Sequence, residues 1–193
     1  MPDIMLKNVV QRFSDLWTPV EFKAGDGKPR WNITVLVEPG SENDKNIQEA
    51  ILAAAKETFN DKAESVLKGM RGQKNQYCYL SGDSVTYDGC EGKMLLAAHR
   101  PLNTKSGKNH APLILAKSPR KPDGTPNLLL ESDGAPYNGC VVNVKVSIWA
   151  QPGENPGIRA SFSAVQLVSD GEAFGASAVS VNEFDDLSAD DLV

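Results

Sequence analysis

The sequence predicts a mainly β protein, a small closed barrel of short strands accompanied by one or two helices. Several segments alternate apolar and polar residues with the period of two that a half-buried strand requires. Glycine, proline, asparagine and aspartate lie between these segments, as they do in turns. One Ala-rich stretch instead repeats its apolar residues at helical spacing. We therefore expect one main helix beside the strands.

The first predicted strand and the main helix follow each other closely. Residues 31–37 (WNITVLV) are mostly β-branched and aromatic, and a Pro-Gly pair follows them shortly afterwards, which indicates a strand before a turn. Ser41 with Asp44 three residues later is typical of a helix N-terminus. The apolar spacing then predicts a helix over about 42–59, and a weaker repeat predicts a second helical segment over 63–70.

The other strands are expected further along the chain, where the periodicity changes to two. In the segment 141–149 an apolar face alternates with a polar face that carries Lys145 and Trp149, so this tryptophan is expected at the surface. Trp31 and Phe162 lie in register with apolar neighbours and are expected in the core. The predicted strands cover residues 76–80, 84–87, 93–99, 112–117, 141–150 and 158–168.

Length and composition indicate one intracellular, soluble domain. The 193 residues are 40% hydrophobic and 23% charged, enough for a self-sufficient core. No stretch of 18 apolar residues occurs, and the first residues lack the pattern of a signal peptide. Cys78, Cys90 and Cys140 are odd in number and widely spaced. They are therefore expected to be buried, reduced thiols rather than a disulfide framework.

The net charge of −5 conceals two regions of opposite sign. Residues 1–169 carry 20 basic and 18 acidic residues, a net charge of +2, whereas residues 170–193 carry seven acids and no lysine or arginine. Between Lys93 and Lys121 there are seven basic residues and no acid. This division predicts a folded domain over 1–169 and a flexible acidic tail over 170–193.

Proteins hold single-stranded nucleic acid with a positive groove for the phosphates and aromatic faces on which bases stack. The basic stretch and the tyrosines of the β region provide candidates for both. A run of basic residues is often only a solvated face, and that interpretation is kept as the alternative. The candidate DNA-binding residues are Lys93, Arg100, Lys105, Lys108, Lys117, Arg120, Lys121, Lys145, Tyr77, Tyr79, Tyr87 and Trp149.

The acidic tail is expected to compete with DNA for the basic groove, because a tethered polyanion has a high effective concentration there. Once released by DNA, its apolar residues among acids would be free to bind a basic pocket on a partner protein. A purely solubilising tail is the alternative. The candidate partner-binding residues are Glu183, Phe184, Asp185, Asp186, Asp190 and Asp191.

The chain resembles the phage-encoded single-stranded DNA-binding proteins that have an oligonucleotide/oligosaccharide-binding (OB) fold and an acidic C-terminus. The likeness lies in the order of three segments and in the tail. The resemblance implies a five-stranded OB barrel with extended hairpins and sequence-independent binding of single-stranded DNA. The implied setting is phage replication or recombination in the cytoplasm of the infected bacterial cell, with polymerase or helicase as partners of the tail. The segments are WNITVLVEPGSENDKNIQEAILAAAKETF, GKMLLAAHRPLNTKSGKNHAPLILAKSPRKP and GCVVNVKVSIWAQPGENPGIRASFSAVQLV.

One departure from that family concerns the C-terminus. Such tails often end in an aromatic residue, whereas this chain ends in Leu192 and Val193. The identity of the tail's partner therefore stays open.

Other classes of function find less support. Cys78, Cys90, His99, His110 and Cys140 span the β region but match no zinc-binding spacing, so no metal or other cofactor is expected. No catalytic motif is present, and the protein is not expected to be an enzyme. The alternatives are a structural or adaptor protein whose acidic tail binds other proteins, and a strand-annealing protein. A homo-oligomer also remains possible.

Overall fold

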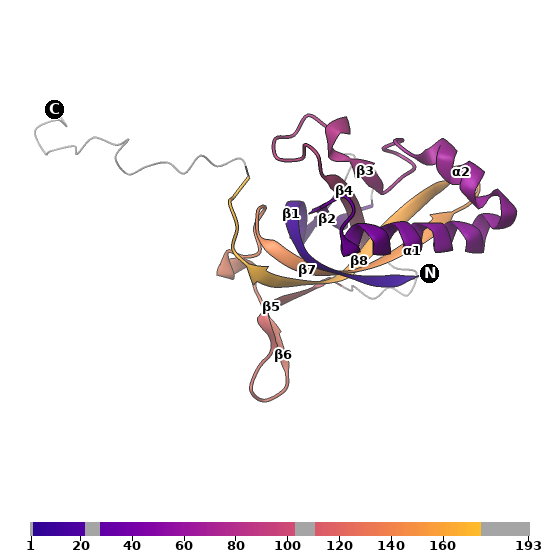
Figure 1. Ribbon diagram of the computed structural model, residues 1–193. Coiled ribbons are helices and arrows are strands. Elements are labelled where there is room, and N and C mark those ends of the chain that lie inside the picture. The colour runs from indigo at the N-terminus through magenta and orange to yellow at the C-terminus, as the bar shows by residue number, and fades with distance from the viewer. Residues whose placement is uncertain (1, 22–27, 103–110, 175–193) are drawn as a thin grey trace, which may run out of the picture.

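The computed structural model describes residues 2–21, 28–102 and 111–174. These residues form one eight-stranded sheet in the order β3-β4-β2-β1-β7-β8-β5-β6, and the predicted mainly β class is confirmed. Helix α1 (Glu42–Phe59) and helix α2 (Ala63–Met70) lie on the opposite side of the sheet from the β5–β6 hairpin (Figure 1). The strands are β1 (Asp3–Val20), β2 (Arg30–Val37), β3 (Tyr79–Ser81), β4 (Met94–Pro101), β5 (Leu113–Arg120), β6 (Pro126–Leu128), β7 (Val141–Gln151) and β8 (Gly157–Ser169).

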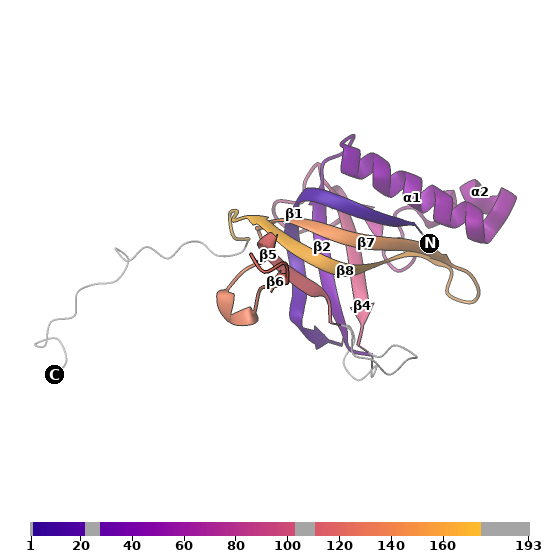
Figure 2. The ribbon, with the colours of Figure 1, turned by 90° about the horizontal axis from the view of Figure 1, so that it is seen from below.

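The sheet curls, so that β2 and β4 cross β7 and β8 (Figure 2). Within the described chain no ladder joins β4 to β8, and the sheet is not closed. The segment 76–78 bridges the gap instead. Cys78 N donates to Ile158 O on β8 (3.1 Å), and Ala97 N on β4 donates to Cys78 O (2.9 Å). Farther along, Arg100 Nη1 donates to Phe162 O (3.3 Å). These contacts hold β4 beside β8.

Strand β1 was not predicted, because irregularities in its pairing interrupt its alternation. Its register shifts between Leu6 and Val9 against β7, and between Gln11 and Phe13 against β2. Each bulge inserts an extra residue and bends the strand. Consequently the buried positions Leu6, Val9, Gln11 and Leu16 do not follow a period of two. The bends let one strand pair with both β2 and β7 along the curled sheet.

The region around residue 84 differs from its prediction. The expected strand over 84–87 is wrong, since a 3-10 turn at Gly82–Ser84 precedes an irregular segment. The expected strand over 76–80 is reduced to β3, with an isolated bridge between Tyr77 and Ile158. Strand β6 lies outside all the predicted strands. Short stretches held by a few ladder bonds leave little periodic pattern in a sequence.

Helix α1 has the predicted bounds and the predicted cap. Ser41 Oγ accepts a hydrogen bond from Asp44 N (3.2 Å), which satisfies one of the free amides of the first turn. The Asp44 carboxylate accepts from Gly40 N (2.7 Å) and from Gln48 Nε2 (2.7 Å). It also accepts from the hydroxyl of Tyr79 (2.9 Å). The helix start is thereby joined to β3.

The core lies inside the curled sheet and beneath α1. The apolar face predicted for β7 is buried, and Trp31 and Phe162 are core residues as expected. In the described part of the chain, neither helix is long and apolar enough to cross a membrane.

The three cysteines are free and buried, as predicted. Burial raises the pKa of the Cys78 thiol to about 12, and the thiolate is the reactive form. We therefore expect iodoacetamide at pH 8 to leave the native protein unmodified and to alkylate all three thiols after denaturation, as counted by mass spectrometry. Rapid labelling of Cys78 in the native protein would contradict the buried position.

Candidate nucleic-acid interface

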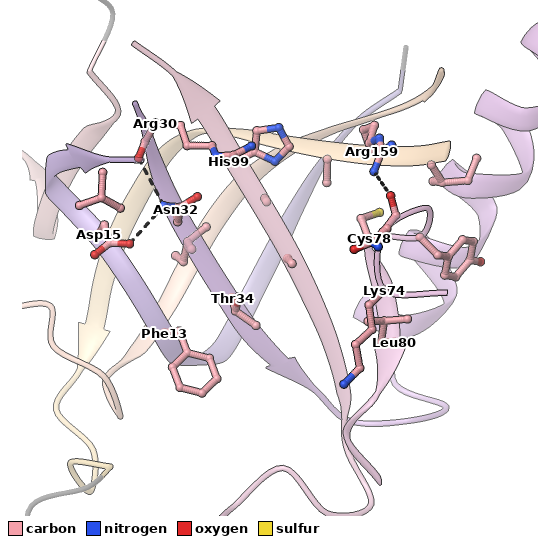
Figure 3. Close-up of a pocket in the computed structure, with 18 of the residues that line it drawn as sticks. Phe13, Asp15, Arg30, Asn32, Thr34, Lys74, Cys78, Leu80, His99 and Arg159 are labelled. Atoms are coloured by element: carbon pink, nitrogen blue, oxygen red, sulfur yellow. Dashed lines mark hydrogen bonds between the residues drawn. The ribbon is translucent and has the colours of Figure 1, made fainter. Parts of the chain in front are cut away.

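A groove of about 560 Å³ crosses the outer face of β1, β2 and β4 and ends at β8 and the segment 74–78. Figure 3 shows Phe13 and Thr34 toward one end of it, and Arg30, His99 and Arg159 along the other side. The side chains come from residues far apart in the chain. The groove is therefore a product of the curled sheet.

Strand alternation decides which side chains reach this groove. On β2, Ile33 and its odd-numbered neighbours are buried, so that Asn32 and Thr34 point to the other face. Opposite them on β4 lie His99 and Ala97, respectively. All four line the groove. Outward-facing positions of the neighbouring strands β2 and β4 thus form its floor.

Charged side chains of both signs surround this floor. Arg30, Lys74 and Arg159 supply positive charge, and Asp15 and Glu21 supply negative charge. Arg159 is fixed in place, because its Nη1 donates to Asn75 O (2.6 Å). The carboxylate of Asp15 accepts from the side-chain amide of Asn32 (3.1 Å). Positive charges thus exceed negative charges by one among these five residues. Arginine and lysine side chains are hydrogen-bond donors that suit anionic groups.

His99 is neutral at neutral pH in this setting. Burial lowers its pKa below the ordinary value of 6.5, and the neighbouring charges of Arg30 and Arg159 lower it further. A neutral imidazole offers one hydrogen-bond donor, one acceptor and a flat ring. It would gain a proton if a negatively charged ligand screened the two arginines.

The groove has an aromatic end. The rings of Phe13 and Tyr87 meet edge to face with their centroids 4.9 Å apart. Tyr87 is 52% exposed, and Phe13 lines the groove itself. Such a pair presents π faces beside the polar floor, as a platform for stacked bases does.

The other predicted aromatic residues have different positions. Tyr77 lines the groove but is only 8% exposed, and Tyr79 is 3% exposed with its hydroxyl bonded to Asp44. Tyr79 therefore has no free face for stacking in this structure. Trp149 is half-buried and lies opposite Arg159 in the β7–β8 ladder. Of the four predicted aromatic residues, Tyr87 is the most exposed.

Three predicted basic residues lie on the β5–β6 hairpin, which extends away from the curled sheet (Figure 1). Lys117 lies 3.8 Å from the carboxylate of Asp170. Arg120 Nη1 donates to Gly124 O (3.2 Å) within the turn, and Lys121 is exposed. None of these three residues lines the groove. They form a second basic surface.

The remaining predicted basic residues are dispersed. Lys93 forms an ion pair with Glu38, and Arg100 of β4 contacts β8. Lys145 is exposed on β7, opposite Met5 of β1. The structure does not describe Lys105, Lys108 or the six predicted tail residues Glu183, Phe184, Asp185, Asp186, Asp190 and Asp191.

Sequence reasoning missed most of the groove. Phe13 lies on the strand that was not predicted, while Arg30, Lys74 and Arg159 stand outside the acid-free basic stretch. One pattern could have found Arg159, since it alternates with the buried residues Ile158 and Ala160 and therefore faces outward. His99 was considered only as a metal ligand. Among the described residues, no group of three or more His, Cys, Asp or Glu side chains could hold a metal ion.

A groove with an aromatic end and with arginine and lysine side chains in its lining, on a curled and mostly antiparallel sheet, is typical of the β proteins that bind single-stranded nucleic acid. The chain belongs to the family described as "Enterobacter phage Enc34, ssDNA-binding protein", whose model matches residues 2–193. The resemblance seen in the sequence is confirmed. "Putative protein p50" of Acyrthosiphon pisum secondary endosymbiont phage 1 is 33% identical over 191 residues, which cover 96% of this chain and 94% of that protein.

Two solved structures share the fold. The single-stranded DNA-binding protein of bacteriophage Enc34, in complex with ssDNA, has a TM-score of 0.66 and 22% identity. The match covers 90% of this chain and 89% of that one. The single-stranded DNA-binding protein gp2.5 of bacteriophage T7 has a TM-score of 0.58 and 9% identity, with 97% of both chains covered.

Proposed function

We propose that this protein binds single-stranded DNA without sequence preference, through the groove on β1, β2 and β4, during phage DNA replication and recombination. The observation that carries the proposal is the Phe13–Tyr87 pair at the end of a groove lined by Arg30, Lys74 and Arg159. The curled sheet is interpreted as an OB barrel of five strands enlarged by the flanking strands. The likeness to a protein solved with ssDNA supports this interpretation.

The lack of sequence preference follows from the kinds of contact available. Every base has a π face, so a stacked ring accepts all four bases. Long basic side chains bind phosphates, which carry no sequence information. The groove supplies both, from Phe13 and Tyr87 at one end and from Lys74 and Arg159 near the other.

The acidic tail is proposed to compete with DNA and to bind replication proteins after its release. The rings of Phe13 and Phe174 both contact the guanidinium group of Arg12, which places Phe174 near the aromatic end of the groove. Glu183 is nine residues farther along the chain. Nine residues span at most about 30 Å, which is enough to bring the first tail acid to the groove. The five acids after Phe174 would then compete with phosphates in a salt-dependent manner.

Fluorescence anisotropy of a labelled oligo-dT tests the groove and the tail together. If about four phosphates are neutralised, affinity falls roughly fiftyfold between 50 and 200 mM salt. A chain ending at Phe174 is expected to bind about tenfold more tightly at 50 mM salt, with a smaller difference at 200 mM. The cut leaves residues 170–174 in place because they contact the folded body.

The matched control keeps the tail and removes its charge, with Glu183→Gln and the four tail aspartates changed to asparagine. This chain should bind as tightly as the truncated one if charge causes the competition. Equal affinity of all three chains would eliminate the competing tail and leave the groove. If none of the three chains binds oligo-dT at 50 mM salt, the proposed function is overturned.

DNA binding is also expected to depend on pH through His99. Burial and, to a smaller extent, the two arginines keep the pKa of His99 low in the free protein, and bound phosphates would raise it. Affinity should therefore be constant well above the pKa that His99 has in the complex. Affinity should rise as the pH falls through that pKa, and level off below the pKa that His99 has in the free protein. A His99→Gln chain should lose the rise between pH 7.5 and 5.5, and an unaltered profile would exclude His99 from the contact.

A second candidate function, a protein-binding adaptor, is favoured by one observation. Leu113, Leu128 and Leu130 are exposed at the base of the β5–β6 hairpin. Exposed apolar side chains that lie together often mark protein contacts. This function predicts no salt-sensitive affinity for oligo-dT, so the same titration separates the two candidates.

A further inference from the structure

Arg12 occupies an unusual position at the aromatic end of the groove. It is the extra residue of the β1 bulge, because Gln11 pairs with Val35 and Phe13 pairs with Thr34. A bulge turns a side chain away from the direction that alternation would give it. Neighbouring side chains of a regular strand point to opposite faces of the sheet. At this bulge the side chains of Arg12 and Phe13 instead contact each other, with the guanidinium carbon 4.4 Å from the centre of the Phe13 ring.

A second ring contacts the same guanidinium. The centre of the Phe174 ring lies 4.3 Å from the guanidinium carbon of Arg12. Arg12 Nη2 donates to Asp88 O (3.0 Å). Its Nε is buried and has no hydrogen-bond partner among the described residues. The planar group is thus held in place by one hydrogen bond and two rings, and one of those rings comes from the far end of the described chain.

Residues 171–174 hold Phe174 in this position. Phe174 N donates to Asn138 O (3.2 Å), and the Tyr137 hydroxyl donates to Gly171 O (2.9 Å). Gly89 leaves room for the ring, since a Cβ there would come within 2.7 Å of it. The ring also packs against the small buried cluster of Leu36, Cys90 and Leu95. Residues 171–174 nevertheless form no ladder with any strand of the sheet. Residues 171–174 can therefore detach without disrupting the sheet.

We propose that Arg12 is a nucleobase-binding subsite that Phe174 occupies in the free protein and that a base of single-stranded DNA takes over. The subsite rests on the proposed function and extends it. Arginine stacks on aromatic and base faces alike. A base on Arg12 would stand next to bases on Phe13 and Tyr87, at the open end of the same groove.

This exchange would connect DNA binding to the tail. Phe174 is the last described residue before the segment with the acids Glu183 to Asp191. While Phe174 remains on Arg12, the tail begins beside the groove. When a base displaces the ring, residues 171–174 are freed and the tail's point of attachment moves back toward β8. DNA would thus remove its competitor and gain a stacking partner in one step.

The first test is a Phe174→Ala substitution in the full chain, titrated with labelled oligo-dT. Removing the competing ring should tighten binding about two- to fivefold, since a cation–π contact contributes about 0.5–1 kcal/mol at an exposed site. Phe59→Ala is the matched control: it removes a half-buried aromatic ring from α1, away from the groove, keeps the charge, and should leave affinity unaltered.

The second test measures the exchange directly in the unaltered protein. Hydrogen exchange of the backbone amides of residues 171–174 should become faster when oligo-dT binds, because the bond from Phe174 N to Asn138 O is lost. An Arg12→Lys chain keeps the charge and loses the planar face. It should bind DNA more weakly, and Phe174→Ala should have no further effect in that background.

The outcomes separate this subsite from the proposed function. If oligo-dT binds but the exchange of residues 171–174 is unaltered, or if Phe174→Ala leaves affinity equal or weaker, the subsite is overturned and the groove stands. If the unaltered chain does not bind oligo-dT at 50 mM salt, the proposed function fails and the subsite fails with it.

Discussion

Changing Phe13 and Tyr87 together to leucine is expected to weaken oligo-dT binding by about thirtyfold to several hundredfold. Base stacking contributes about 1–3 kcal/mol per base, and leucine keeps part of the apolar contact while it removes both π faces. The two rings touch each other, with 4.9 Å between their centroids, so their effects should be coupled rather than additive. Anisotropy titrations of the single and double variants would measure this coupling.

The matched control is Phe59→Leu. Phe59 is a half-buried aromatic residue at the end of α1, on an element that contributes nothing to the groove. Phe59→Leu should lower the stability about as much as a single Phe13 or Tyr87 substitution does, and it should leave DNA affinity unchanged. Thermal unfolding of each variant shows that the fold persists. If the double variant bound oligo-dT as tightly as the unaltered chain, the aromatic end of the groove would not be a DNA contact.

The elements that were predicted well have regular patterns. Helix α1 was located by its cap and its apolar spacing, and β7 by strict alternation from Val142 to Ile148. Strand β1 was not found because its bulges at residues 7–8 and 12 break that alternation. The same bulges shape the interface, since the second one places Arg12 beside Phe13. The bulges that prevented the prediction of β1 are thus also the bulges that position side chains at the candidate site.

The candidate site was predicted less well than the fold, because residues that are close in the sequence need not be close in the folded protein. Charge density along the chain located Lys117, Arg120 and Lys121, and the fold places them on the β5–β6 hairpin, outside the groove. Arg30 and Arg159 are 129 residues apart in the sequence and line the same groove. Only the curled sheet brings them together, and no local pattern encodes that proximity.

Tyr79 was predicted to bind DNA because it is aromatic, but its contacts indicate that it stabilises the fold. Its hydroxyl donates to the buried carboxylate of Asp44. Aromatic residues with a polar tip serve in cores as well as on surfaces. A Tyr79→Phe chain is therefore expected to lose stability and to keep its DNA affinity.

Asp44→Ala is expected to lower the free energy of unfolding by about 2–4 kcal/mol. The change removes the acceptor for Gly40 N, Gln48 Nε2 and the Tyr79 hydroxyl. A buried donor left without a partner costs about 1–3 kcal/mol, and the start of α1 loses a stabilising negative charge. Urea unfolding followed by circular dichroism would measure the loss.

The pH dependence of stability distinguishes this carboxylate from others. Burial acts to raise the pKa of Asp44, but hydrogen bonds from Gln48, Gly40 and Tyr79 outweigh it and hold the pKa below the ordinary value of 3.8. The stability that these bonds contribute is therefore present above pH 3.8 and is lost as the pH falls through the lowered pKa. In Asp44→Ala this part of the acid transition should disappear. Oligo-dT affinity at pH 7 should not change, because Asp44 and Tyr79 lie outside the groove; a loss of affinity by the folded variant would mean that this buried pair also positions the DNA-binding face.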